Sequence, residues 1–233
     1  MSITITITKD NKDVDVDIPT EWKDMTVKYW AQMALIISSH QKSLESEKKG
    51  HLEENESKPD VNITAILNDA EIVDTLKLNR DIFCYISGLT KEAMKEVDMN
   101  QVTTVIETLG VLMKEYEPKG LRSFEFEGET YHFPSEYLKK NTYGDFIEST
   151  QLDMNIEQMK NGRYDVLPAQ MAILCRREGE EYDEDLLEAK TEKFQNLPMD
   201  TVYEFAFFLT NAAEKLVKVS NIYLGKKDKT QVL

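Results

Sequence analysis

The two halves of the chain carry the same series of sequence signals. The step Ile18-Pro19-Thr20-Glu21-Trp22 recurs as Phe133-Pro134-Ser135-Glu136-Tyr137, and the apolar pattern of residues 97–109 recurs at residues 197–209. A fixed order of strand, proline, aromatic and helix signals in each half is typical of related modules. The sequence therefore predicts two modules, not one domain built around a single pocket.

Each half opens with a predicted β-hairpin. Isoleucine alternates with threonine over residues 3–7, and valine or isoleucine alternates with aspartate over residues 14–18, before Pro19 ends the second strand. In the second half, residues 123–126 and 130–133 flank a turn at Gly128, so the same hairpin is expected in a tighter form.

Amphipathic helices are predicted where apolar residues recur at helical spacing after a residue that favours a helix start. These starts are Thr26, Thr90, Asn100, Thr142 with Asp145, Pro168 and Asp200. A further helical pattern over residues 72–86 ends at Gly88, because glycine readily adopts the left-handed conformation of a C-cap. The predicted fold class is α+β and predominantly α-helical, with two pseudo-repeated modules that are each a β-hairpin followed by a small helical bundle.

The best candidate for a boundary between the modules is Glu117-Pro118-Lys119-Gly120. It predicts an N-terminal module at residues 1–117 and a C-terminal module at residues 118–233, the latter ending in a basic tail. Residues 40–62 are almost entirely polar or charged and cannot pack a core. We interpret them as a mobile charged loop or a frayed helical hairpin.

The formal charge of −15, from 43 acidic and 28 basic residues, narrows the partners that this chain can bind. Such a charge repels phosphate backbones and anionic lipid surfaces, so neither direct nucleic-acid binding nor membrane binding is expected. No apolar run approaches the roughly 20 residues that span a bilayer. A rarer alternative is mimicry of DNA, in which carboxylates imitate phosphates.

Cysteine and histidine residues are the first candidates for chemistry. Cys84 and Cys175 lie in apolar helical runs and align with each other in the repeat, which favours core packing and a reducing cytosol over a disulfide. A structural role is also favoured for the three histidines, since none has an adjacent cysteine or serine motif. They are His40, His51 and His132.

The run Glu178–Asp185 contains six carboxylates in eight residues and could in principle ligate calcium. It lacks the spacing of a calcium-binding EF-hand loop, and acidic residues are favourable before a helix without any metal. The chain also has no phosphate loop, dinucleotide fingerprint or zinc-ligand pair. We therefore predict no catalytic residue, cofactor or metal site, and no enzymatic activity.

Aromatic residues at fixed places suggest packing roles and one candidate surface. Trp22 and Tyr137 follow their prolines at the same offset, and each is expected to pin its hairpin to the first helix of the module. In the run Tyr203–Leu209, Phe205 belongs to the core stripe, whereas Phe207 points to the opposite side. Phe207 is expected either to pack between the modules or to contribute to a partner surface.

A family resemblance rests on the opening hairpin, the proline step and two segments of the second half. The segments are Ala172-Ile173-Leu174-Cys175-Arg176-Arg177-Glu178-Gly179-Glu180-Glu181-Tyr182-Asp183 and Phe194-Gln195-Asn196-Leu197-Pro198-Met199. Together they resemble tail assembly chaperone-like and virion-associated proteins of tailed bacteriophages, including crAss-like phages and other phages of gut Bacteroidota. The resemblance is clearest over residues 124–212. The chain departs from a simple chaperone in being duplicated.

This resemblance implies a non-enzymatic bacteriophage morphogenesis protein. It would bind other virion or tail proteins, either as a tail assembly chaperone or as a structural or packaged virion component, and could form a homo-oligomer. The implied location is the host cytoplasm during assembly, or the virion. Two alternatives stay open: an acidic host-directed inhibitor of a DNA-binding enzyme, and an unrecognised hydrolase that uses Cys84, Cys175 or His132.

Overall fold

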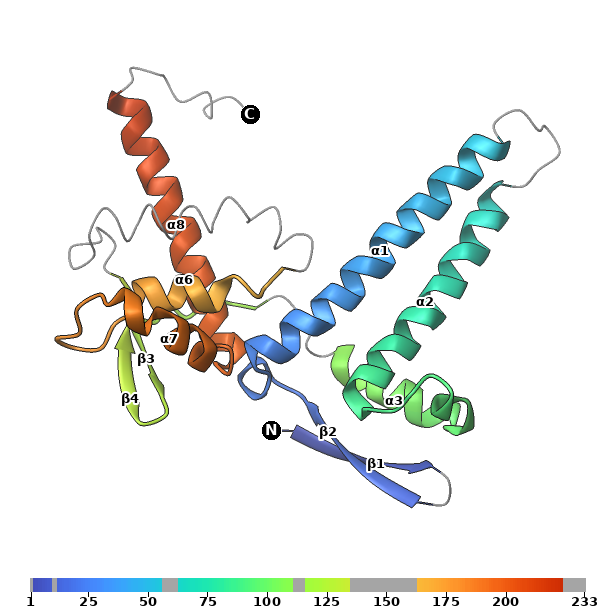
Figure 1. The fold of residues 1–233 in the computed structure, drawn as a ribbon. Helices are drawn as coiled ribbons and strands as arrows, with labels where there is room; N and C mark the ends of the chain where they lie inside the picture. The colour runs from blue at the N-terminus through green and yellow to red at the C-terminus, as the bar shows by residue number, and fades with distance from the viewer. Residues whose placement is uncertain (1, 10–11, 56–62, 111–115, 135–162, 224–233) are drawn as a thin grey trace. The chain divides into compact units, whose positions relative to one another are not determined.

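The structure is a computed structural model that describes all residues except 1, 10–11, 56–62, 111–115, 135–162 and 224–233. It is a mixed α+β fold, mostly helical, with two small antiparallel hairpins (Figure 1). The chain divides into two compact units. Residues 1–115 together with 156–164 form the first, and residues 116–155 together with 165–233 form the second.

The first unit opens with the predicted hairpin. Strand β1 (Ser2–Lys9) pairs antiparallel with β2 (Lys12–Pro19), so that isoleucines of β1 stand opposite the valines and isoleucine of β2. Ile7 and Ile18 on this apolar face are fully buried. On the other face, threonine hydroxyls donate hydrogen bonds to aspartates of β2. These are Thr4 to Asp17 at 2.6 Å and Thr6 to Asp15 at 2.8 Å.

The hairpin leads through the short 3-10 helix η1 (Trp22–Asp24) into the long helix α1 (Val27–Asn55). The predicted cap is confirmed, because the hydroxyl of Thr26 accepts a hydrogen bond from the backbone N–H of Tyr29. Trp22 also packs as expected, with its ring edge-on to that of Trp30 in α1 at 4.9 Å. The corresponding Tyr137 lies outside the described residues.

Residues 40–55 continue α1, so the prediction of a loop over this part of residues 40–62 is wrong, and the alternative of a helical hairpin is nearer to the structure. Helix α2 (Ile63–Ser87) returns alongside α1. Lysine, glutamate and glutamine are good helix formers and need no core to propagate a helix. Lys48 of α1 also pairs with Glu71 of α2 at 3.1 Å.

Helix α2 ends as predicted at Gly88, where φ is +67°. The 3-10 helix η2 (Ala93–Glu96) follows, and the hydroxyl of Thr90 accepts from the N–H of Ala93 at 3.2 Å.

Helix α3 (Met99–Gly110) packs three of the predicted residues into the core, namely Val102, Val105 and Leu109. The prediction that Asn100 caps this helix is wrong. The carboxylate of Asp98 accepts from the N–H of Asn100 at 2.7 Å, so Asn100 lies inside the helix. Asp98 and Asn100 are equally good caps by residue type, and the backbone geometry selects the earlier one.

The second unit contains the tighter hairpin. Strand β3 (Ser123–Phe126) pairs with β4 (Glu129–His132). The two turn residues, Glu127 and Gly128, both have positive φ, which matches the twist of a two-residue hairpin. Arg176 extends the ladder beyond β4, since its carbonyl accepts from the N–H of His132 at 2.8 Å.

The described part of this unit also contains three α-helices: α6 (Leu167–Leu174), α7 (Leu187–Phe194) and α8 (Met199–Tyr223). Pro168 lies in the first turn of α6, as predicted. Phe205 is fully buried on α8, whereas Phe207 is 48% exposed. The helix predicted from Thr142 lies outside the described residues.

Candidate functional site

The cysteines lie in environments that disfavour the thiolate. Cys175 is fully buried directly after α6, and burial raises the pKa of its thiol. Cys84 is half-buried in α2, where its sulfur lies 3.8 Å from that of Met94, and burial again raises the thiol pKa. Because nucleophilic cysteines need a lowered pKa, both residues fit packing roles.

Side chains of the acidic run Glu178–Asp185 form hydrogen bonds and ion pairs with other groups of the protein. The carboxylate of Asp183 accepts from the N–H of Asp185 and caps the 3-10 helix η4 (Glu184–Leu186), as the prediction of a helix start requires. Glu180 pairs with Arg177 and with Lys190. Within the described ranges, no group of three metal-binding side chains comes together.

His40 lies between two carboxylates. Its Nδ1 is 3.1 Å from Asp74 and its Nε2 is 3.2 Å from Asp81, both on α2. Both ring nitrogens can donate only when the imidazole is protonated. Asp81 also accepts from Arg80 at 2.8 Å and from Lys91 at 3.0 Å.

The cluster links α1 to α2, because His40 of α1 contacts Asp74 and Asp81 of α2, which lie 34 and 41 residues further along the sequence. Burial would raise the pKa of Asp81, but hydrogen bonds from Arg80, Lys91 and His40 outweigh it and lower the pKa to about 2. Sequence reasoning placed His40 beside a polar stretch and missed both aspartates. Since these side chains bond to one another across the two helices, the cluster fits a structural role.

A second charged cluster ties the β3–β4 hairpin to α7. Glu129 accepts hydrogen bonds from the hydroxyl of Tyr131 at 2.7 Å and from Lys193 at 2.9 Å, and it also pairs with Arg177. These three donors lower the pKa of Glu129 to about 2. The same carboxylate raises the pKa of Lys193.

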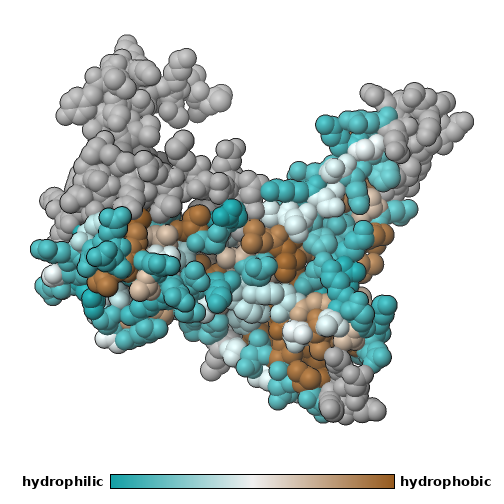
Figure 2. Space-filling view, in the orientation of Figure 1, coloured by the Kyte–Doolittle hydropathy of each residue, from teal (hydrophilic) through white to brown (hydrophobic). Residues whose placement is uncertain are grey.

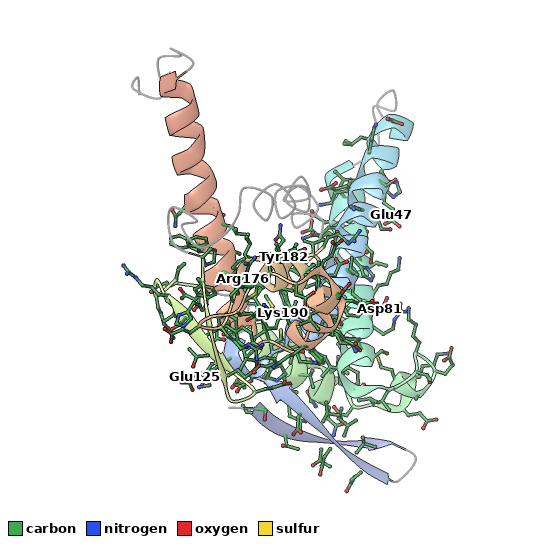
Figure 3. All side chains as sticks on the ribbon, turned by 60° about the vertical axis from the view of Figure 1, so that its left-hand side comes forward. Glu47, Asp81, Glu125, Arg176, Tyr182 and Lys190 are labelled. Carbon is green, nitrogen blue, oxygen red and sulfur yellow. The ribbon has the colours of Figure 1, made fainter. Side chains whose placement is uncertain are left out.

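Lys190 lies one turn before Lys193 on α7 and points inward. Its ammonium donates to the carbonyl of Cys175 at 2.8 Å and to Glu180 at 2.7 Å, and burial lowers its pKa despite that ion pair. Figure 3 labels Lys190 together with Arg176 and Tyr182, whose guanidinium and ring stack at 5.3 Å. The loop after α6 is thus held by side chains from several elements.

The Glu129 cluster predicts an acid transition that can be followed at one residue. Because the folded pKa is lowered, the stabilisation by Glu129 is complete above its ordinary pKa of 4.5 and is lost as the pH falls towards about 2. In an NMR titration, the Glu129 carboxyl should have its midpoint near pH 2. Replacing Lys193 with alanine should move that midpoint upward, whereas an unchanged midpoint would contradict this assignment.

Glu204 is a buried carboxylate that the sequence interpretation did not single out. It is 2% exposed on α8 and accepts a hydrogen bond from the hydroxyl of Tyr116 at 2.8 Å. Three successive backbone N–H groups also donate to it, from Lys119 at 2.5 Å, Gly120 at 2.9 Å and Leu121 at 3.0 Å. The sequence did contain a signal for this site, namely a glutamate within an apolar helical run, because a buried charge requires hydrogen-bonding partners.

These donors determine the direction in which the pKa of the Glu204 carboxyl shifts. Burial would raise its pKa, but the hydrogen bonds from Lys119, Tyr116, Leu121 and Gly120 together outweigh burial and lower the pKa. Gly120 has a φ of +70°, the left-handed conformation that helps successive N–H groups converge on one anion. Glu204 therefore anchors the start of the second unit to α8.

The clearest candidate for a binding surface is an apolar ridge on α2, formed by Ile72, Val73 and Leu76. Their exposed fractions are 59%, 48% and 51%, while Asp74 beside them is only 7% exposed. Over residues 72–76, helix α2 thus turns an acidic residue inward and apolar residues outward, the reverse of the usual arrangement. Figure 2 shows apolar residues among hydrophilic ones along α2, at the right-hand edge of the view.

Comparison with protein-family models, with curated proteins and with solved structures finds no match to this chain. A search of the described helices for a segment long and apolar enough to cross a membrane finds none.

Proposed function

We propose that this chain is a non-enzymatic bacteriophage morphogenesis protein that binds other virion or tail proteins. The observation that carries the proposal is the α2 ridge of Ile72, Val73 and Leu76, which presents apolar side chains to a partner. The resemblance of residues 172–183 and 194–199 to tail assembly chaperone-like and virion-associated proteins supports the same assignment.

In this proposal the two units are pseudo-repeated modules with similar binding faces. The order of elements supports a common origin, since a hairpin precedes helices in each unit and the helices α3 and α8 begin at Met99 and Met199. Val102 and Val202 are buried at matching positions. Two similar modules on one chain would raise the avidity for a repeated partner such as a tail subunit.

The proposed mode of action is to cover an apolar surface of a tail or virion subunit. The ridge would remove apolar area of that subunit from water, while the charge of −15 would keep the complex soluble. The protein would act in the host cytoplasm during assembly, or remain in the particle. Quantitative mass spectrometry of purified virions and assembly intermediates tests this: absence from both would refute the assignment.

The ridge itself can be tested by affinity purification from phage-infected cells. Replacing Ile72, Val73 and Leu76 together with serine should reduce recovery of tail or virion proteins about tenfold or more, because the apolar contact area is lost. The control is Leu186→Ser, which changes an exposed apolar residue outside α2. Equal recovery with the triple variant and the unmodified protein would rule out the ridge as the binding surface.

An acidic host-directed inhibitor is the second candidate, favoured by one feature of β2. Asp13, Asp15 and Asp17 are exposed and alternate along the strand, so their carboxylates form a row on one face of the hairpin. Such a row could occupy a phosphate-binding groove of a DNA-binding enzyme. Copurification with a host nuclease or polymerase, lost when the three aspartates are replaced with asparagine, would favour this candidate over morphogenesis.

A further inference from the structure

The outer edge of β1 carries backbone groups that β2 does not use. Among the described residues, β1 belongs to a two-stranded sheet and pairs with β2 alone. Ser2 stands opposite Pro19, which has no N–H, so this pair cannot exchange two ladder hydrogen bonds. Because hydrogen-bonded and non-hydrogen-bonded pairs alternate in an antiparallel ladder, Thr4 and Thr6 must also point their N–H and C=O groups away from β2.

One hydrogen bond supports this orientation independently. The side-chain amide of Gln101, at the start of α3, donates to the carbonyl of Thr6 at 3.2 Å. That carbonyl therefore does not serve the pairing with β2. The remaining outward groups of Ser2 and Thr4 offer a ready template for another strand.

The sequence of β1 is suited to antiparallel pairing with β1 of a second copy of the chain. Ser2-Ile3-Thr4-Ile5-Thr6-Ile7-Thr8 reads almost the same in both directions about Ile5. When two such strands pair antiparallel about Ile5, isoleucine meets isoleucine and hydroxyl residue meets hydroxyl residue. All isoleucines then stay on one face of the sheet, because directly opposed residues share a face.

The other edge of the hairpin does not allow the same pairing. Strand β2 carries Asp13, Asp15 and Asp17, so pairing of two β2 strands about Asp15 would place carboxylates directly opposite one another. Between Ser2 and Thr8, in contrast, β1 has no charged residue. Charge thus protects the β2 edge and leaves the β1 edge open to self-pairing.

We propose that two copies of this chain associate through their β1 edges, antiparallel and centred on Ile5, to form a four-stranded sheet with the order β2-β1-β1-β2. The N–H of Thr6 in one copy then donates to the carbonyl of Thr4 in the partner copy, and the N–H of Thr4 donates to the second lone pair of the Thr6 carbonyl, whose first lone pair accepts from Gln101. The pair of Ile5 residues on the two-fold axis is a non-hydrogen-bonded pair. This interface is independent of the proposed function in phage assembly.

The dimer would cover apolar residues that the single chain exposes. Ile3 is 49% exposed at the open end of β1, and in the dimer it stands opposite Ile7 of the partner copy. Removing such side chains from water is the driving force expected for the association.

A pair of cysteine variants tests the register directly, in full-length protein with Cys84→Ser and Cys175→Ala. Across the axis the two Ile5 Cα atoms should lie about 4.5 Å apart, within the range of a disulfide. The two Ile3 Cα atoms should lie about 14 Å apart, since four residues separate Ile3 from the position opposite its counterpart. Ile3→Cys is the matched control, because Ile3 is the more exposed of the two.

Under mild oxidation, Ile5→Cys should form a crosslinked dimer at least about tenfold faster than Ile3→Cys, since the dimer holds the two thiols at a high effective concentration. Analytical ultracentrifugation should give twice the chain mass of 26.9 kDa. Thr4→Pro should yield a monomer while circular dichroism stays unchanged, because the N–H that it removes points away from β2 and the Thr4–Asp17 hydrogen bond that is lost with it lies on the exposed face of the hairpin. A monomer at all concentrations, or equal crosslinking of the two cysteine variants, would overturn the proposal.

Discussion

Replacing Glu204 with alanine is expected to lower the free energy of unfolding of the second unit by about 2 to 4 kcal/mol. The change removes a carboxylate that four donors share, the hydroxyl of Tyr116 and the backbone N–H groups of Lys119, Gly120 and Leu121. It also leaves a space among apolar residues of α8. The segment 116–121 should consequently detach from the helix.

Glu204→Gln is the conservative control for this prediction. A glutamine keeps one acceptor oxygen but turns an N–H₂ group towards backbone donors, so about half of the loss is expected. Because the two units need not unfold together, native-state hydrogen exchange of residues 116–121 and of α8 is the suitable measurement. Unchanged protection in Glu204→Ala would show that the four hydrogen bonds do not hold this segment.

The same site sets the acid sensitivity of the second unit. The pKa of Glu204 is lower in the folded protein than its ordinary value of 4.5, so its stabilisation is complete above pH 4.5. It is lost as the pH falls through the folded pKa. The difference in stability between unmodified protein and Glu204→Gln should therefore shrink on acidification, whereas a difference independent of pH would contradict the assignment.

Phe205→Ala is the second substitution with a large expected effect, a loss of about 3 to 5 kcal/mol. Phe205 is fully buried on α8, and its ring centroid lies 6.2 Å from that of Phe133, directly after the β3–β4 hairpin. Truncation removes apolar area from the core and leaves a cavity that the hairpin and helix cannot fill.

Phe207→Ala is the matched control, two residues further along the same helix. Because Phe207 is 48% exposed, its truncation should change stability by no more than about 0.5 kcal/mol. Hydrogen exchange of β3, β4 and α8 measures both variants under the same conditions. Similar losses for the two phenylalanines would show that α8 packs through a different face.

Features set by neighbouring residues could be predicted from the sequence. Alternation along β1 and β2, the hydroxyl of Thr26 as a helix cap, and the stop at Gly88 all occur as expected. Each depends on side-chain periodicity or on one residue's backbone preference, which act over a few positions. The loss of apolar signal after residue 40 was misleading, since a helix can continue without facing a core.

The sequence alone determined the mostly helical α+β class, the two hairpins, and the direction of Phe207 away from the core residue Phe205, because these follow from local periodicity. Only the tertiary structure decided which distant groups meet. It placed His40 between Asp74 and Asp81, and it brought the segment starting at Tyr116 onto Glu204. Such pairings join residues tens of positions apart, and folding selects them by satisfying every buried charge at once, which local patterns do not encode.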